Sequence, residues 1–175
     1  MRELGFSENE LKLIRIAGYL HDIGKVAIPI EILEKPDILT EEEYNIIKLH
    51  AYYSYRILEH IEGLELINEW GSFHHERLDG SGYPFGIKGD GLSLGSRIIA
   101  IADVFTALIE DRPYRRGMDI DEALDNIRSL VRANKLDRYI FSVLERNVIS
   151  MGERLSSVKQ IALGRFSRFY PEIKG

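Results

Sequence analysis

Residues 7–25, SENELKLIRIAGYLHDIGK, decide the fold of this chain. Ser7, with Glu10 three residues later, forms the pattern of a capping box, which predicts the start of a helix. Apolar residues then recur at three- and four-residue spacing, as is typical of one buried helical face. They are Leu13, Ile16, Ala17, Leu20 and Ile23. The predicted helix carries the adjacent residues His21 and Asp22 in its last turn.

The pair of His21 and Asp22 offers an imidazole nitrogen and a carboxylate oxygen from neighbouring positions, which suits a divalent metal ion. The dipeptide is common, so that taken alone it indicates no more than a structural role. Four further potential ligands lie on other predicted helices or at their ends: His50, His74, His75 and Asp103. Because four of the chain's five histidines fall in this set, we interpret the sequence around a metal centre.

The other periodic segments are also helical. Thr40 with Glu43 forms a second capping box and opens a helix to about residue 60. The inward side of this helix carries His50, together with Tyr44, Ile47, Ala51, Ser54 and Leu58. Further helices are predicted over residues 64–74, 94–109, 119–131 and 137–148.

The segment 94–109 is apolar almost all round, so we expect it to be a central helix. Asp103 lies alone in it, and a buried carboxylate is strongly disfavoured unless it is paired. The patterns together predict an all-α helical bundle of about six or seven helices. We predict one domain over residues 1–150 and a C-terminal extension of uncertain structure, packed on that domain, over residues 151–175.

Composition narrows the classes of function. The length of 175 residues suits one well-packed domain. A net charge of −5 argues against a protein that coats nucleic-acid polymers. The sequence has no cysteine, which excludes thiolate metal sites and disulfides. No apolar run approaches a membrane span and no signal-peptide pattern is present, so a cytoplasmic location is the default expectation.

Nitrogen and carboxylate ligands without sulfur suit Fe, Mn, Zn, Co or Ni, and Mg less well. Six ligands are too many for one ion that keeps open positions and enough for two. Two ions about 3.5–4 Å apart can share a bridging hydroxide and hold the oxygens of a phosphoester. Lys25 could then bind a phosphate as a point charge, and Arg112 and Arg115 could bind phosphates through two nitrogens each.

Each of these residues also has a plainer interpretation. His50 could be a buried histidine that pairs with a carbonyl group. The histidines at positions 74 and 75 could form a solvated helix end, with Glu76 and Arg77 as surface charges. The arginine group could be a solvated helix C-terminus. His60, near Glu59 at a helix end, is assigned no role in the site.

Several segments resemble the HD-GYP family, a branch of the HD metal-dependent phosphohydrolases. The resemblance covers about residues 7–148, and its most specific part is HHERLDGSGYP at residues 74–84. The other matching segments are HDIGK at residues 21–25, ILEKP at residues 32–36 with Leu39 and Thr40, His50, and ADVF at residues 102–105 through RPYR at residues 112–115.

The resemblance implies an all-helical HD fold with a two- or three-metal centre, often of iron or manganese. It implies hydrolysis of cyclic di-GMP, a bacterial second messenger, through a metal-bridged hydroxide, to the linear dinucleotide or onward to GMP. Partner domains of the sensor, receiver or GGDEF type would accompany such a domain. The implied metal ligands are His21, Asp22, His50, His74, His75 and Asp103, with Asp22 bridging two ions.

Further roles are carried over in the same way. Lys25 matches the lysine near the scissile phosphate, and Arg112 and Arg115 match contacts to the phosphates of the ligand. The loop Gly82-Tyr83-Pro84 matches the signature of the family. Its implied role is to shape the rim of the pocket or to meet partner domains rather than to take part in the chemistry.

The sequence departs from the family at three places. An earlier helix, which in the family supplies a further histidine and in some members a glutamate, would lie before the first residue. Ser54 stands where a glycine is usual, and Thr106 stands where a second aspartate is usual. We therefore expect two metal ions rather than three, with one site short of a ligand. The chain is then either a fragment of a longer protein or a shortened member.

Three functions remain in view. The first is a metal-dependent phosphodiesterase for cyclic di-GMP. The second is a catalytically impaired signalling module that binds a nucleotide or a partner protein. The third is an HD phosphohydrolase that acts on another nucleotide or phosphate ester.

Overall fold

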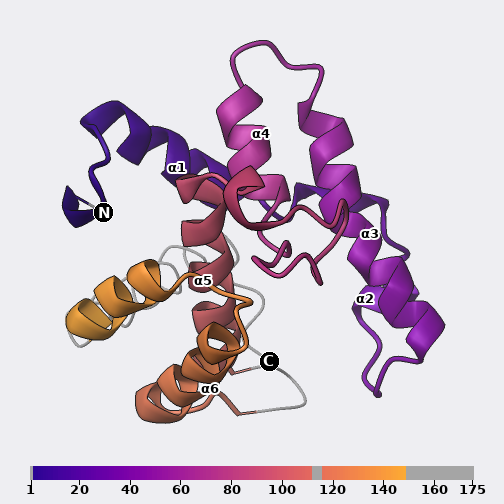
Figure 1. Ribbon diagram of the computed structural model, residues 1–175. Coiled ribbons are helices and arrows are strands. Elements are labelled where there is room, and N and C mark those ends of the chain that lie inside the picture. Colours follow the sequence, from indigo (N-terminus) through magenta and orange to yellow (C-terminus); the bar gives the residue numbers. More distant parts are fainter. Residues whose placement is uncertain (1, 112–115, 149–175) are drawn as a thin grey trace, which may run out of the picture. The chain divides into compact units, whose positions relative to one another are not determined.

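The computed structural model describes residues 2–111 and 116–148, and within these ranges it contains helices and no strand (Figure 1). The elements are η1 (Arg2–Leu4), α1 (Glu8–Leu20), η2 (Ile23–Ala27), α2 (Ile30–Leu33), α3 (Glu41–Leu58), α4 (Glu65–Ser72), η3 (Gly89–Gly91), α5 (Leu94–Ile109) and α6 (Ile120–Arg132). A further helix begins at residue 138. The prediction of an all-α fold is confirmed. None of the described helices has both the length and the apolar character that a membrane span requires.

The chain divides into two units after Phe141. In the second unit the described residues are 142–148, and all of them are helical. Residues 151–175, for which we predicted a C-terminal extension, lie outside the described residues, and that division of the chain stays a prediction.

Three helices begin with capping boxes, as their sequences predict. Glu10 and Ser7 exchange hydrogen bonds at the start of α1, and Glu43 and Thr40 do so at the start of α3. Asp119 caps α6 in the same way, together with Glu122. Each box satisfies N–H groups that the first turn of a helix leaves without partners, which fixes where the helix starts.

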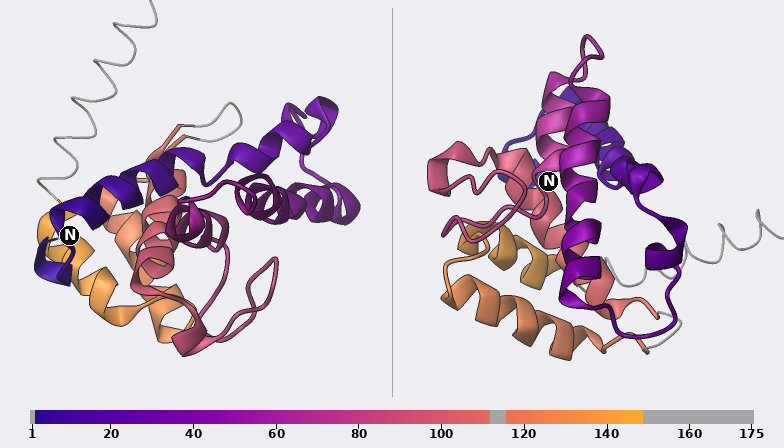
Figure 2. Two further views of the ribbon diagram at one scale, coloured as in Figure 1. Left: turned by 90° about the horizontal axis from the view of Figure 1, so that it is seen from above. Right: turned by 90° about the vertical axis from the view of Figure 1, so that its right-hand side faces the viewer.

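In the first unit α5 is the central helix, with α4 packed at one end and α6 at the other (Figure 1). α1 packs on α4, and α3 packs on both α4 and η2. Figure 2 shows η2 and α2 running alongside α3. The core includes Ala17, Ile67, Trp70, Ile99 and Phe105. Gly71, near the end of α4, lies close to Ala17 and His21, so the ends of α1 and α4 meet, and α4 also packs on α3 and α5.

Three of the predicted inward positions are exposed, and one of them is Ile23, which is 38% exposed in η2, beyond the end of α1. Ile16 is 40% exposed, while the buried residues of α1 are Ile14 and Ala17. α1 packs on α4 and contacts α5, and it does so through a face that includes Ile14 and Ala17 rather than Ile16. Tyr44, in the first turn of α3, is 49% exposed and its ring faces the ammonium group of Lys48 instead of the core.

Candidate metal centre

The turn after α1 lies against the middle of α3. α1 ends at Leu20, and the chain passes through His21 and Asp22 into η2. In η2, Gly24 approaches α3 so closely that a Cβ atom there would lie 2.0 Å from the carbonyl oxygen of His50. Only glycine fits at this distance, and its presence lets Asp22 and His50 come together.

Ser54 joins the same two elements through its hydroxyl group. Its side chain is completely buried, one helical turn after His50. The Oγ atom donates a hydrogen bond to the carbonyl oxygen of His21 at 2.8 Å and accepts one from the N–H of Gly24 at 2.9 Å. This residue, where the family usually has glycine, thus satisfies two backbone groups of the turn that presents Asp22.

Asp22 lies in the middle of the predicted ligands. Its Oδ1 atom is 3.2 Å from Nε2 of His50 and 4.0 Å from Nε2 of His74. Its Oδ2 atom is 3.3 Å from Nε2 of His21 and accepts a hydrogen bond from the ammonium group of Lys25 at 2.5 Å. One carboxylate therefore faces two histidines with one oxygen, and a histidine and a lysine with the other.

Three of the histidines are oriented by the backbone of their own segment. His21, His50 and His74 donate from Nδ1 to the carbonyl oxygen three residues earlier, at 2.7, 2.6 and 2.6 Å. Because a carbonyl group only accepts, Nδ1 carries the proton, and a neutral ring has its lone pair on Nε2. Pairing with a carbonyl, the plainer interpretation of His50, is therefore compatible with metal binding through the other nitrogen.

The Nε2 atoms of His50 and His74 are 3.4 Å apart. Burial lowers the pKa of His50, and burial together with the charge of His21 lowers the pKa of His74 to about 3. Both rings are therefore neutral at pH 7, and two lone pairs converge on Oδ1 of Asp22. A divalent cation would stabilise this arrangement. Two nitrogens bound to one tetrahedral ion at 2.0–2.1 Å lie roughly 3.3–3.4 Å apart, so the spacing fits.

The remaining two predicted ligands are His75 and Asp103, and each lies next to a histidine already described. The potential ligand atoms form two groups, each within 4.8 Å: His50, His74 and His75 in one, and His21, Asp22 and His74 in the other. Oδ1 of Asp103, on α5, is 3.8 Å from Nε2 of His21. Five of the predicted residues thus lie in two groups that share His74, and Asp103 lies next to His21 of the second group.

The charges at the centre favour a cation. Burial disfavours the charged form of Asp22, but hydrogen bonds and charges of His21 and Lys25 outweigh it and hold its pKa far below the usual range. Burial also acts to lower the pKa of His21, and Asp22 outweighs it, so that this pKa is raised. Burial raises the pKa of Asp103. A firmly anionic carboxylate among nitrogen ligands, without sulfur, suits divalent Fe, Mn, Zn, Co or Ni.

Comparison with known protein families matches residues 1–140 to the family described as HD domain. The chain belongs to the HD domain family. The match includes His21 and Asp22, the pair from which the sequence was interpreted, and the comparisons confirm the resemblance to the HD-GYP branch.

Curated relatives of this HD domain are phosphodiesterases by name. The chain is 46% identical over 146 residues to 3'3'-cGAMP-specific phosphodiesterase 1 of Vibrio cholerae, which covers 83% of this chain and 34% of that protein. It is 45% identical over 130 residues to a cyclic di-GMP phosphodiesterase of Thermotoga maritima, covering 73% and 35%. A cyclic di-GMP phosphodiesterase response regulator of Xanthomonas campestris is 44% identical over 126 residues, covering 70% and 33%. The chain spans about a third of the length of these relatives.

The predicted phosphate-binding residues fall into two classes. The side chain of Lys25 is 44% exposed, and in the structure its ammonium group pairs with Asp22. Arg112 and Arg115 lie outside the described residues. Their roles in this HD domain stay predictions.

Sequence reasoning gave Glu76 no role of its own, and it placed Glu76 at the surface only in the plainer interpretation of the neighbouring histidines. The side chain is 1% exposed. Its carboxylate accepts hydrogen bonds from the N–H groups of Phe85, Gly86 and Ile87. Arg77 is not a free surface charge either, because it donates to the carbonyl oxygens of His74 and Glu76, and burial lowers its pKa. The dense cluster of glycines that follows was the signal that this segment folds back on itself.

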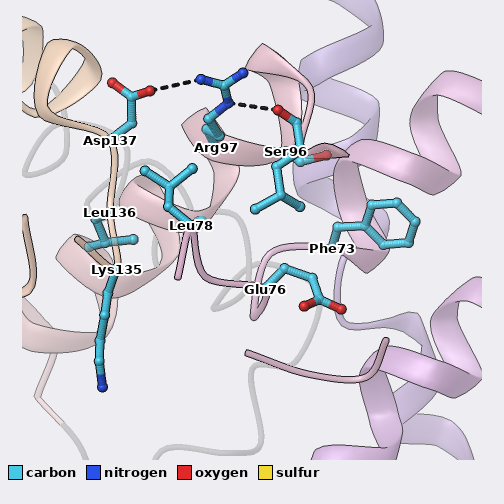
Figure 3. Close-up of a pocket in the computed structure, with 10 residues that line it drawn as sticks. Phe73, Glu76, Leu78, Ser96, Arg97, Lys135, Leu136 and Asp137 are labelled. Atoms are coloured by element: carbon cyan, nitrogen blue, oxygen red, sulfur yellow. Dashed lines mark hydrogen bonds and ion pairs between the residues drawn. The ribbon is translucent and has the colours of Figure 1, made fainter. Parts of the chain in front are cut away.

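Two cavities lie outside the six predicted ligands of the HD domain. One, of about 10 Å³, is lined by parts of residues 73–78, α5 and residues 135–137, and could hold about one water molecule (Figure 3). The other, of about 600 Å³, is lined by residues that include Glu59, Glu65, Glu69 and Asp90. Four carboxylates disfavour a phosphate ligand, so we do not assign the substrate to this cavity.

Proposed function

We propose that this HD domain hydrolyses the phosphodiester bonds of a cyclic dinucleotide, with cyclic di-GMP as the first candidate substrate. The observation that carries the proposal is the convergence of two histidine lone pairs on Oδ1 of Asp22. We propose that two divalent ions, Fe or Mn first, are held by His21, Asp22, His50, His74, His75 and Asp103. The names of the relatives support the substrate class.

The side chains of the chain have distinct parts in this reaction. Bound divalent ions would polarise the phosphoryl oxygens and lower the pKa of the attacking water. Asp22, anionic across the physiological range, offers both of its oxygens to the centre. The Nδ1 bonds of three histidines aim Nε2 inward, and in the neutral rings of His50 and His74 this nitrogen carries no proton. Lys25, at the partly exposed side, would leave Oδ2 and neutralise a phosphate oxygen of the substrate.

A second substrate has a specific observation in its favour. The relative that matches 83% of the chain at 46% identity is named as specific for 3'3'-cGAMP. Both candidates contain two phosphodiester bonds in a ring and differ in one purine base. The residues of the metal centre meet the phosphates, which these substrates share, so the centre itself does not separate the two.

The test is turnover by the chain loaded with Mn²⁺ or, without oxygen, Fe²⁺. Cyclic di-GMP, 3'3'-cGAMP, the linear dinucleotide and a non-cyclic nucleotide are compared by chromatography of the products. Asp22→Asn keeps the shape of the side chain and removes its charge. Loss of outer partners of a metal site already costs about 10- to 100-fold, so we expect this loss of charge to lower turnover by at least about 100-fold. Asp90→Asn, on an exposed residue, is the control.

The outcomes separate the three functions. Cleavage of a cyclic dinucleotide that is lost in Asp22→Asn and kept in Asp90→Asn supports the proposal. Preference for the non-cyclic nucleotide would favour an HD phosphohydrolase with another substrate. Binding of cyclic di-GMP without cleavage, in protein with its metal bound, would overturn the proposal in favour of a binding module.

A further inference from the structure

Glu76 is a buried carboxylate for which the described residues provide no ion pair. Oε1 accepts hydrogen bonds from the N–H groups of Phe85 at 2.7 Å and Gly86 at 3.1 Å, and Oε2 accepts one from Ile87 at 3.0 Å. Figure 3 shows the Glu76 carboxylate turned away from Arg97, which pairs with Asp137. A buried charge is costly unless it is compensated, and here three consecutive backbone donors compensate it.

These bonds close the loop of residues 77–87 onto its own beginning. The N–H of Tyr83 donates to the carbonyl oxygen of His75 at 3.3 Å. Gly82 packs so closely that a Cβ atom there would lie 2.4 Å from the nitrogen of Arg77 and from Cα of Glu76. Tyr83 lies just before residues 85–87, so the hydrogen bonds from these residues to Glu76 help to fix its position.

The closed loop places the ring of Tyr83 on the imidazole of His75. The two centroids are 4.7 Å apart and the planes are inclined by 29°, which is a stacked arrangement. His75 differs from the other three histidines of the centre, because within the described residues its ring has no hydrogen bond to a carbonyl group. Stacking on Tyr83 takes the place of that bond.

We infer that Glu76 is a positioning residue for His75. By holding the N–H groups of residues 85–87, it keeps Tyr83 stacked on the imidazole, and so it sets the direction in which His75 offers its ring nitrogen. The inference rests on the proposed function in one respect, since it takes His75 as a metal ligand. The geometry of the ring can nevertheless be measured without metal or substrate.

The experiment uses the whole chain with isotope-labelled histidine, treated with chelator, and follows the ring protons by NMR. Five histidines give few signals, and those of His75 are identified by their absence in His75→Gln. Glu76→Gln keeps the shape of the side chain but replaces one accepting oxygen with an NH₂ group. This group faces a backbone N–H and cannot accept its hydrogen bond. Tyr83→Ala removes the stacked ring, and Tyr83→Phe keeps it. Glu10→Gln, which alters a carboxylate that accepts the N–H of Ser7, is the matched control.

We expect the His75 signals to move downfield in Glu76→Gln, toward their position in Tyr83→Ala, because the ring current of Tyr83 is lost. The signals stay in place in Tyr83→Phe and Glu10→Gln. With Co²⁺ as the probe, affinity falls by about 10- to 100-fold in Glu76→Gln and Tyr83→Ala but not in the other two, the range found for outer partners of metal ligands.

A drop in thermal stability with unmoved His75 signals would show that Glu76 is merely structural and would overturn the inference. Signals that move in neither Glu76→Gln nor Tyr83→Ala would overturn it too. If Glu76→Gln does not fold, Glu76→Asp, which keeps the charge but is too short to reach all three donors, gives the same readout. Moved signals in a chain without turnover would uphold the inference and count against the proposed function, and the reverse pattern would do the opposite.

Discussion

Ser54 shows what a single departure from a family pattern can mean. Its hydroxyl group bonds both His21 and Gly24 and so ties α3 to the turn that carries Asp22. The other departure, Thr106, bonds the carbonyl oxygen of Ala102 one turn earlier in α5. The first substitution supports the metal centre, and the second supports only its own helix.

Ser54→Ala should destabilise the fold by about 1–3 kcal/mol, because it leaves a buried N–H and a buried carbonyl group without this partner. Ser129→Ala is the control, since Ser129 also donates to a carbonyl oxygen but is exposed. We expect that change to stay within about 0.5 kcal/mol. Urea unfolding of both variants measures the difference, and equal effects would contradict the role given to Ser54.

Gly24→Ala should destabilise the fold by about 3 kcal/mol, at the upper end for overpacking, because the new methyl group meets the backbone of α3. Gly18→Ala is the matched change, since a Cβ atom at Gly18 has no heavy atom within 4 Å. In helix α1 it should stabilise the fold by up to about 1 kcal/mol. Thermal unfolding of the two variants should therefore shift in opposite directions, and tolerance of alanine at position 24 would refute the close contact.

The residues that gather at the candidate metal centre could be predicted because few histidines are available and most fall into one pattern; that they bind metal stays a prediction. Their mutual distances could not, because Gly24 and Ser54 set them through contacts between distant segments. Glu76 was missed for a related reason. A glutamate next to an arginine in the sequence is usually expected to be solvent-exposed. The three hydrogen-bond partners of Glu76 are backbone N–H groups, which a pattern of side chains does not reveal.

For the helices, the residue at which each begins could be predicted from the sequence, but the side that is buried could be predicted less well. A capping box is a local signal of four residues, and α1, α3 and α6 each begin where theirs lies. The choice between Ile14 and Ile16 as a buried position depends on which stripe of α1 meets α4. That choice is made by the partner helix, so the spacing within α1 could not decide it.

The start of α3 should respond to acid. Lys35 donates to both carboxylate oxygens of Glu43, at 2.9 and 2.7 Å, and this is the main reason why the pKa of Glu43 lies below its ordinary value of 4.5. A carboxyl whose pKa is lower in the folded state stabilises the fold above the unfolded pKa. That contribution is lost as the pH falls through the folded pKa.

The difference in unfolding midpoint between the natural chain and Lys35→Met should therefore be constant above about pH 5 and shrink below pH 4.5. Lys35→Arg keeps the positive charge and should keep the acid dependence of the natural chain. Thermal unfolding from pH 7 to pH 3 tests this. A difference that persists unchanged at pH 3 would show that the pair does not act through the charge of Glu43.

For the molecule as a whole, the candidate metal centre joins four segments: the turn after α1, α3, the segment after α4, and α5. A ligand that binds only when these segments are assembled stabilises the folded state. The fold class and the family could be predicted from sequence, because long periodic helices and an eleven-residue signature are both strong signals. How the segments close around Asp22 required the structure.

Metal binding should weaken as the pH falls. Among the four histidines of the centre, His21 alone has a raised pKa, through Asp22, and those of His50, His74 and His75 are lowered, chiefly by burial. A proton on His21 must leave before its nitrogen can bind an ion. We therefore expect affinity for Mn²⁺ to decline as the pH falls through the range in which His21 takes up a proton, and we expect His21 to be the main source of the protons released on binding.

Calorimetry in buffers with different heats of ionisation counts the released protons. His60→Gln is the control, because His60 is 77% exposed beside Glu59 and lies outside the centre. The variant should release as many protons as the natural chain. Constant affinity from pH 8 to pH 5, or release of three protons at pH 7, would contradict the charge states described for the centre.

The bonds from Nδ1 of His21, His50 and His74 to carbonyl oxygens three residues earlier also bear on the entropy of binding. Ordering a free side chain costs on the order of 1 kcal/mol. For these three rings that loss of rotameric freedom has already occurred during folding, because each is tied to its own segment. An arriving ion therefore meets nitrogens that are immobilised in advance, and more of the energy of each new bond remains as affinity.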